Sequence, residues 1–221
     1  HGDLDASRLV EMRRGRQAID TRVISDARMD DVIEGLGRHI SAGRQAYWVC
    51  PLVEQGEAED EAAAEARAAI LRARFGAEMI GVVHGRMPGP EKDAVMEAFA
   101  SGRLKLLVAT TVIEVGVNVP NATLMIVEAA ERFGLAQLHQ LRGRVGRGDQ
   151  HSFCMLLHGQ NLSETARSRL ALMRETNDGF RIAEEDLRLR GEGDVLGTRQ
   201  SGLPGFRIAR LEVHGKLLSA A

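Results

Sequence analysis

The sequence lacks the marks of several protein classes. Its 221 residues include only two cysteines, Cys50 and Cys154, which stand far apart and form no CxxC pair. This argues against a disulfide framework or a structural zinc site and fits a reducing cytoplasm. No apolar run reaches the roughly 18 residues of a membrane-spanning helix, and no signal peptide is visible. The formal net charge is only −2, so a nucleic-acid partner would have to be held by a local basic surface.

Phosphate-binding loops are missing as well. The sequence contains no G-x-x-x-x-G-K-[ST] string, the loop that cradles nucleotide phosphates. Two glycine-rich strings, at 143–148 and 191–197, do not follow strands as a dinucleotide loop must. The acidic run at 54–65 is interpreted as a solvated loop and helix start, because its DEA letters do not end a buried strand. Alone, the chain does not look like a complete enzyme, and its start at His1 leads us to expect part of a longer protein.

The sequence does contain an alternation of strand and helix patterns. Short runs rich in Val, Ile and Leu, several of them continuous, are typical of strands buried on both faces of a parallel sheet. Strands that alternate with helices predict an α/β doubly wound domain, a parallel sheet flanked by helices. We expect strands at 21–24, 45–53, 79–84, 104–110, 123–129 and 152–158, and helices at 28–41, 58–75, 89–101 and 134–146.

The pattern changes after residue 160. Residues 163–190 have helical spacing, with Ser163 as an N-cap and a break into two helices at 177–179. A glycine-rich, charged loop is expected at 191–205. We therefore predict three parts: a linking segment at 1–20, the α/β domain at 21–160, and a helical hairpin with a loop at 161–221.

The string QLHQLRGRVGRG at 137–148 gathers arginines and glycines at the end of a helix pattern. Placed on a helix, 134–147 has an apolar stripe and a polar stripe, with Arg142 pointing largely away from the polar one. Gly143 and Gly146 would let another surface approach the backbone. Arginine matches phosphate oxygens, so the polar stripe predicts a phosphate-facing surface. The apolar stripe consists of Leu135, Leu138, Leu141 and Val145, and the polar stripe of Gln140, Arg144 and Arg147.

These strings resemble the motifs of superfamily 2 helicases. QLRGRVGR is similar to their motif VI, ATTVIEVGVNVPNA (109–122) to motif V, and VVHGRMPGPEKDAVMEAF (82–99) to the segment before it. With GDLDAS, ETNDGF and DLRLRGEGDVLGTRQSG, they resemble the RecG family of ATP-dependent DNA helicases over nearly the whole chain. The resemblance implies a second RecA-like motor domain, of P-loop NTPase fold without Walker A, followed by the translocation (TRG) motif. The wedge and first motor domains would lie upstream.

The resemblance also implies residue roles. Arg144 and Arg147 would be arginine fingers, with Gln140 beside them, for ATP and Mg²⁺ bound mainly by the first motor domain. Gly116 and Asn118 would approach the nucleotide, although many relatives have Asp at the position of Asn118. DNA-backbone contacts would come from His84, Gly85, Arg86, Thr110 and Thr111, of which His84 and the threonines also fit ordinary strand-end packing. The coupling residues would be Arg169, Arg190 and Gln200, with the two arginines paired to acids such as Glu184 or Asp186.

The function implied is that of the C-terminal motor half of a double-stranded DNA translocase, which remodels stalled replication forks and Holliday junctions and is inactive as an ATPase alone. Its partners would be branched duplex DNA and its own upstream domains, as a monomer at the nucleoid in a bacterial cytoplasm, with no membrane and no metal site of its own. Two alternatives stay open. One is the motor of a transcription-repair coupling translocase, which shares the ERFGLAQLHQLRGRVGR-like run, and the other is a nucleic-acid-binding module with a degenerate RecA fold.

Overall fold

The computed structural model describes residues 18–52, 56–110 and 118–201, with side chains described as far as Gly191 except that of Glu57. The chain divides after Asn177 into two compact units, which are described one at a time. This division leaves the helix at 164–175 with the first unit. The expected domain limits at 20 and 160 stay predictions.

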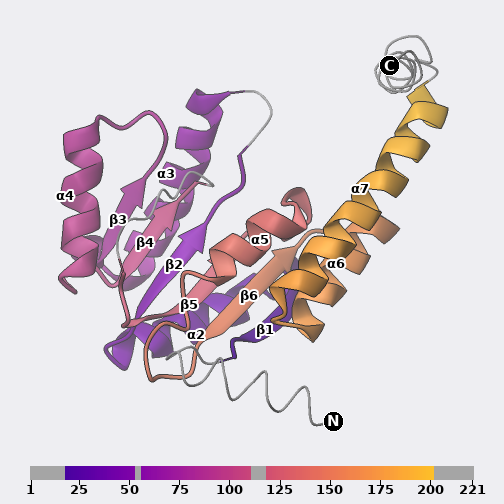
Figure 1. The fold of residues 1–221 in the computed structure, drawn as a ribbon. Helices are drawn as coiled ribbons and strands as arrows, with labels where there is room; N and C mark the ends of the chain where they lie inside the picture. The colour runs from indigo at the N-terminus through magenta and orange to yellow at the C-terminus, as the bar shows by residue number, and fades with distance from the viewer. Residues whose placement is uncertain (1–17, 53–55, 111–117, 202–221) are drawn as a thin grey trace, which may run out of the picture. The chain divides into compact units, whose positions relative to one another are not determined.

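The first unit is built on one parallel sheet with the strand order β1-β6-β5-β2-β4-β3 (Figure 1). All six predicted strands are present. In β2 to β5 every residue is buried, which is why these runs are continuously apolar. The strands are β1 (Asp20–Ser25), β2 (Gln45–Val49), β3 (Ile80–Val83), β4 (Leu106–Ala109), β5 (Ala122–Val127) and β6 (Phe153–His158).

Helices cover both faces of the sheet. On one face, α2 (Met29–Ser41) and α3 (Glu57–Phe75) pack on a core cluster that includes Trp48 and Leu106. The opposite face carries Tyr47, whose ring contacts Phe99 of α4 (Gly89–Ala100) at a centroid distance of 5.1 Å. The strand register aligns Tyr47, Met125, Cys154 and Thr21 on this second face. This second face of the sheet is covered by α5 (Leu135–Arg142) and α6 (Glu164–Glu175). Short 3-10 turns η1 (Asp26–Arg28), η2 (Ala77–Met79) and η3 (Ala130–Arg132) complete the unit.

The helix predicted at 134–146 ends earlier than expected. It stops at Arg142 with Gly143 as its C-cap, and Gly146 has a φ of 79°, in the left-handed region that glycine enters without steric cost. Arg144 and Arg147 therefore lie in a turn, and the prediction that they share a helical stripe with Gln140 is wrong. Burial of Leu135, Leu138 and Leu141 confirms the apolar stripe on α5, and Val145 is also buried but lies after the helix.

In the second unit, α7 spans Gly179–Ser201. The predicted break at 177–179 is confirmed, because α6 ends at Glu175. The loop predicted to start at 191 is wrong as far as Ser201, since the helix continues through Gly191 and its neighbours. Glycine costs about 1 kcal/mol in a helix but keeps the N–H donor that proline lacks, so glycines alone do not end a helix.

Candidate functional site

The turn after α5 lies next to the segment that leads into β5. Because β5 and β6 are parallel, α5 must run back toward the amino ends of the strands, and the turn lies there. Gly148 is packed so closely that a Cβ on it would lie 3.2 Å from the Pro120 carbonyl oxygen. Asn118 is exposed two residues before Pro120. The structure thus brings the arginine turn (143–148) close to the end of the 109–122 segment, whereas Gly116 lies outside the described residues.

Arg144 and Arg147 influence each other electrostatically in this turn. Arg147 is exposed, and its Nε donates to the Gly143 carbonyl at 3.1 Å. Burial and, next, the charge of Arg147 lower the pKa of the half-buried Arg144. Burial raises the pKa of Tyr47 to about 12. The charges of Arg144 and Arg147 act to lower it, so the Tyr47 side chain lies near both arginines. Two neighbouring guanidinium groups favour an anion that can bind both. Gln140 is exposed on α5 itself and not in this turn.

The role of Arg142 was missed by the sequence analysis, which placed its side chain merely away from the polar stripe. The side chain is 2% exposed. Its Nη1 donates to the Met173 carbonyl at 2.6 Å and to the Thr21 hydroxyl at 3.2 Å. Burial lowers the pKa of this guanidinium. Arg142 therefore ties the end of α5 to β1 and α6, and no spacing rule distinguishes it from its exposed neighbours.

The predicted DNA contacts gather at the carboxyl edge of the sheet. Thr110 directly follows β4, is buried, and donates its N–H to the Val83 carbonyl at 3.3 Å. His84 directly follows β3 and is also buried, while Gly85 and Arg86 are exposed. A Cβ on Gly85 would meet nothing within 4 Å, so a partner could approach the backbone there. Thr111 lies outside the described residues.

Glu61 of α3 lies beside two of these groups. Its Oε1 is 3.7 Å from His84 Nε2, and its Oε2 is 3.6 Å from Arg86 Nε. The three residues line a pocket of about 680 Å³ between α3 and α4. The acidic run, interpreted from sequence as only a solvated helix start, thus contributes one carboxylate to the predicted DNA surface.

The coupling residues are placed differently from one another. Arg169 of α6 donates from Nη2 to the Glu131 carbonyl at 3.1 Å, and the Glu131 carboxylate accepts the Gly159 N–H at 3.1 Å. The suggested pairing of Arg169 with Glu184 or Asp186 stays a prediction. In α7, Arg190 does pair with Asp186, at 3.0 Å between Nη2 and Oδ2. Gln200 lies in α7, but its side chain is outside the described set.

A second group that sequence reasoning missed lies at the carboxyl ends of β2 and β5. The Glu128 carboxylate accepts two hydrogen bonds from Arg67, each at 2.8 Å, and one from Trp48 Nε1 at 2.9 Å. The Arg67 guanidinium lies 5.3 Å from the Trp48 ring centroid. The hydrogen bond to Glu128 is the main cause that raises the pKa of Arg67. Among the described residues, no three His, Cys, Asp or Glu side chains are grouped so that they could hold a metal ion. None of the described helices combines the length and the apolar character that a membrane span requires.

Comparison with known proteins identifies the family. The helicase conserved C-terminal domain model matches residues 27–149. The chain belongs to this family. A second model, for the C-terminal part of domain 3 of ATP-dependent DNA helicase RecG, matches residues 176–221.

Curated relatives named ATP-dependent DNA helicase RecG match nearly the whole length of the chain. The protein from Acidithiobacillus ferridurans is 54% identical over 96% of the chain and 31% of the relative. That from Escherichia coli strain K12 is 53% identical over the same shares, and that from Bacillus subtilis strain 168 is 46% identical over 94% of the chain and 30% of the relative. The chain thus spans about a third of these relatives, and the resemblance to the RecG family is confirmed.

Solved structures confirm the RecA-like fold. The structure of RecG bound to a three-way DNA junction matches with a TM-score of 0.69 and 43% identity, covering 92% of this chain and 26% of that one. Domain 2 of the DEAD-box helicase Mss116p bound to an RNA duplex matches with a TM-score of 0.57 over 77% of this chain and 69% of that one. Because its identity is only 18%, the second match supports the fold alone.

Proposed function

We propose that the chain is the second motor domain of an ATP-dependent DNA helicase that moves on duplex DNA and remodels stalled forks and Holliday junctions. The RecG relatives support this activity, as does the three-way junction in the related structure. The match at 176–221 to a RecG-specific model favours this function over a transcription-repair coupling translocase. We place the protein at the bacterial nucleoid, as a monomer that works with upstream wedge and motor domains.

The observation that carries the proposal is the arginine turn beside the end of the 109–122 segment. ATP with Mg²⁺, held mainly by a P-loop-bearing motor domain, supplies the phosphoryl group whose hydrolysis drives the cycle. From this side, Arg144 and Arg147 would contact its phosphates and neutralise the charge that develops in the transition state. Asn118 would accept a hydrogen bond from a ribose hydroxyl. Gln140, outside the turn, would have at most a supporting role.

The DNA strand would follow the carboxyl edge of the sheet. There Thr110 and Thr111 would bind backbone phosphate, and His84, Gly85 and Arg86 would extend the contact. The 109–122 segment begins at this edge and ends beside the arginine turn. A change in the ATP cleft would therefore reach the DNA contacts through one continuous stretch of chain. Arg169, Arg190 and Gln200 would transmit it to the TRG motif.

The test replaces Arg147 with alanine in the full-length protein. We expect the rate of DNA-stimulated ATP hydrolysis to fall by about a thousandfold, and Arg147→Lys not to restore it, because lysine lacks the planar fork of donors. Affinity for branched duplex DNA should be retained. Arg132→Ala, which removes an exposed arginine of η3, is the matched control. Unchanged hydrolysis in Arg147→Ala would remove the basis of the proposal. The chain alone is expected to hydrolyse no ATP.

A further inference from the structure

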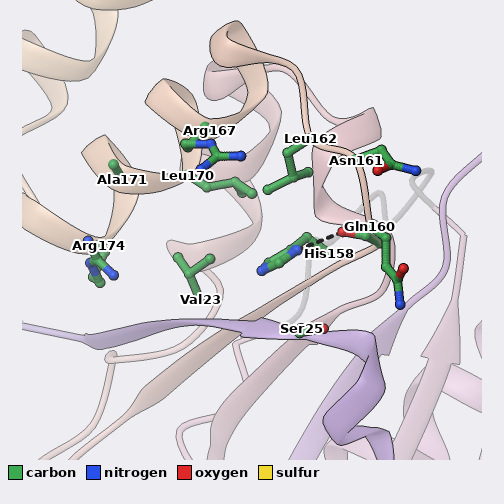
Figure 2. Close-up of a pocket in the computed structure, with 11 residues that line it drawn as sticks. Val23, Ser25, His158, Gln160, Asn161, Leu162, Arg167, Leu170, Ala171 and Arg174 are labelled. Carbon is green, nitrogen blue, oxygen red and sulfur yellow. Dashed lines mark hydrogen bonds between the residues drawn. The ribbon is translucent and has the colours of Figure 1, made fainter.

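A second pocket, of about 430 Å³, opens at the carboxyl ends of β1 and β6 beneath α6 (Figure 2). None of its lining residues was predicted to bind ATP or DNA. Its wall is formed by the ends of the two strands, the loop after β6, and one face of α6. The lining residues are Val23, Ser25, His158, Gly159, Gln160, Asn161, Leu162, Arg167, Leu170, Ala171 and Arg174.

The pocket lies where the chain leaves two neighbouring strands in opposite directions. After β1 the chain enters α2, which packs on the Trp48 face of the sheet. After β6 it enters α6, which packs against β1 on the opposite face. Since β1 and β6 are adjacent and parallel, their departing loops separate and leave a crevice. Such crevices outside the carboxyl ends of strands are where α/β sheets bind ligands.

The lining has the chemistry of an anion site with an apolar floor. It includes two arginines and a histidine and no carboxylate. Arg167 and Arg174 are exposed and seven residues apart, so they lie on one side of α6, separated by about 10 Å along the helix axis. Leu170 and Ala171 lie between them and, with Val23 and Leu162, give the apolar surface. This arrangement suits a ligand with an apolar middle and an anionic group on each side.

His158 provides a flat surface inside the pocket. Its Nδ1–H donates a hydrogen bond to the Gly159 carbonyl at 2.8 Å, which holds the ring in place, and Figure 2 shows the ring lying between β1 and α6. Two carboxylates approach Gly159: a Cβ there would lie 3.5 Å from Glu131 Oε2 and 3.7 Å from Asp26 Oδ2. The Glu131 carboxylate already accepts the Gly159 N–H. Neither acid lines the pocket, so the arginines dominate its walls.

We propose that this pocket binds one nucleotide of a single DNA strand. The base would stack on the His158 ring and rest on Leu162 and Leu170, a use of histidine that is common for unpaired bases. The phosphates on either side of that nucleotide would pair with Arg167 and Arg174. The parallel sheet puts this pocket on the same edge as Thr110 and His84, so a strand separated from the duplex could be held there. The inference rests on the proposed function in taking the strand to be DNA.

The experiment measures the binding of a fluorescent oligothymidylate to the full-length protein by anisotropy. Replacing both arginines with glutamine (Arg167→Gln with Arg174→Gln) should weaken binding about tenfold. The control pair, Arg38→Gln with Arg74→Gln, removes the same charge from exposed positions elsewhere and should change affinity less than twofold. His158→Ala should weaken binding and His158→Phe restore it, which a role through charge or through the hydrogen bond to Gly159 would not do.

Three results would overturn the inference. One is equal affinity of the pocket and control variants for the oligonucleotide. Another is failure of His158→Phe to restore binding. The third is displacement of the oligonucleotide by thymidine monophosphate as effectively as by a thymidine trinucleotide, which would make the ligand a free nucleotide. The duplex affinity of Arg86→Gln separates the pocket assignment from the proposed function. If Arg86→Gln binds duplex DNA more weakly while the pocket variants bind the oligonucleotide as the wild type does, only the pocket assignment fails. If Arg86→Gln and Arg147→Ala both leave duplex binding and ATP hydrolysis unchanged, the proposed function fails.

Discussion

The Glu61 carboxylate on α3 lies 3.6 Å from the guanidinium of Arg86, in the chain after β3, and both side chains line the pocket between α3 and α4. A DNA phosphate that binds Arg86 must displace this carboxylate or share the arginine with it. Glu61→Gln keeps the shape of the side chain and removes its charge. Exposed ion pairs are worth up to about 1 kcal/mol, so we expect affinity for duplex DNA to rise roughly two- to fivefold. Binding titrations with duplex DNA at several salt concentrations measure this affinity.

A matched control lies one turn further along the same helix. Glu65 is paired with Arg72 at 3.7 Å, away from Arg86, so Glu65→Gln should have a much smaller effect. Equal gains for the two variants would mean that only the overall charge of α3 matters. No gain for Glu61→Gln would show that Glu61 does not compete with DNA.

Arg142→Met is expected to destabilise the first unit. Methionine fills a similar volume but leaves the Met173 carbonyl and the Thr21 hydroxyl without the donor they have now. Losing donors for buried acceptors costs roughly 2 kcal/mol. Urea unfolding followed by circular dichroism measures the loss, and Arg132→Met at an exposed position of η3 serves as the control. Equal stability of the two variants would show that the buried hydrogen bonds of Arg142 contribute little.

The cluster of Trp48, Arg67 and Glu128 offers an optical test, since Trp48 is the only tryptophan of the chain. Glu128→Gln should weaken the hydrogen bond to Trp48 Nε1 and shift its fluorescence emission. The variant should also lose roughly 1–3 kcal/mol of unfolding free energy, because a charged hydrogen-bonded pair is broken. A double-mutant cycle with Arg67→Met isolates the pair. The exposed pair Arg28–Asp31, at 3.2 Å, should show a coupling energy near zero.

The two cysteines predict the behaviour of the protein at high pH. Burial raises the pKa of the Cys50 and Cys154 thiols to about 12 from a usual value near 9. The unfolded chain therefore releases these protons first, so their contribution to stability is complete below about pH 9 and is lost as the pH rises toward 12. Both thiols should react with iodoacetamide at neutral pH only after unfolding. Cys50→Ala with Cys154→Ala should lose less unfolding free energy than the parent between about pH 8 and pH 11. An equal loss would assign the effect to other groups, such as Tyr47.

The candidate site could be predicted from sequence only in part. Arg144 and Arg147 were expected together and are together, but in a turn where Gly146 adopts a positive φ and not on a helix. Helical periodicity continues through glycines in a sequence even where the backbone leaves the helix. Thr110 and His84 were correctly expected at strand ends. The partners of Glu61 and Arg142 could not be found, because they depend on which helix faces which strand, and this spacing along the chain does not record.

The sequence by itself determined the six strands, the α/β architecture and the family, because each depends on local apolar pattern or on short motifs. Only the tertiary structure decided that Arg142 is buried while Arg144 and Arg147 are not. It also placed the Glu61 carboxylate beside Arg86, and opened a pocket with two arginines where β1 and β6 send their helices to opposite faces. These relationships depend on strands that are far apart in the sequence, as in the pairing of β1 with β6, where Ile24 lies beside Leu157, 133 positions later. Long-range packing sets them, since the exposure of a side chain depends on what lies against it.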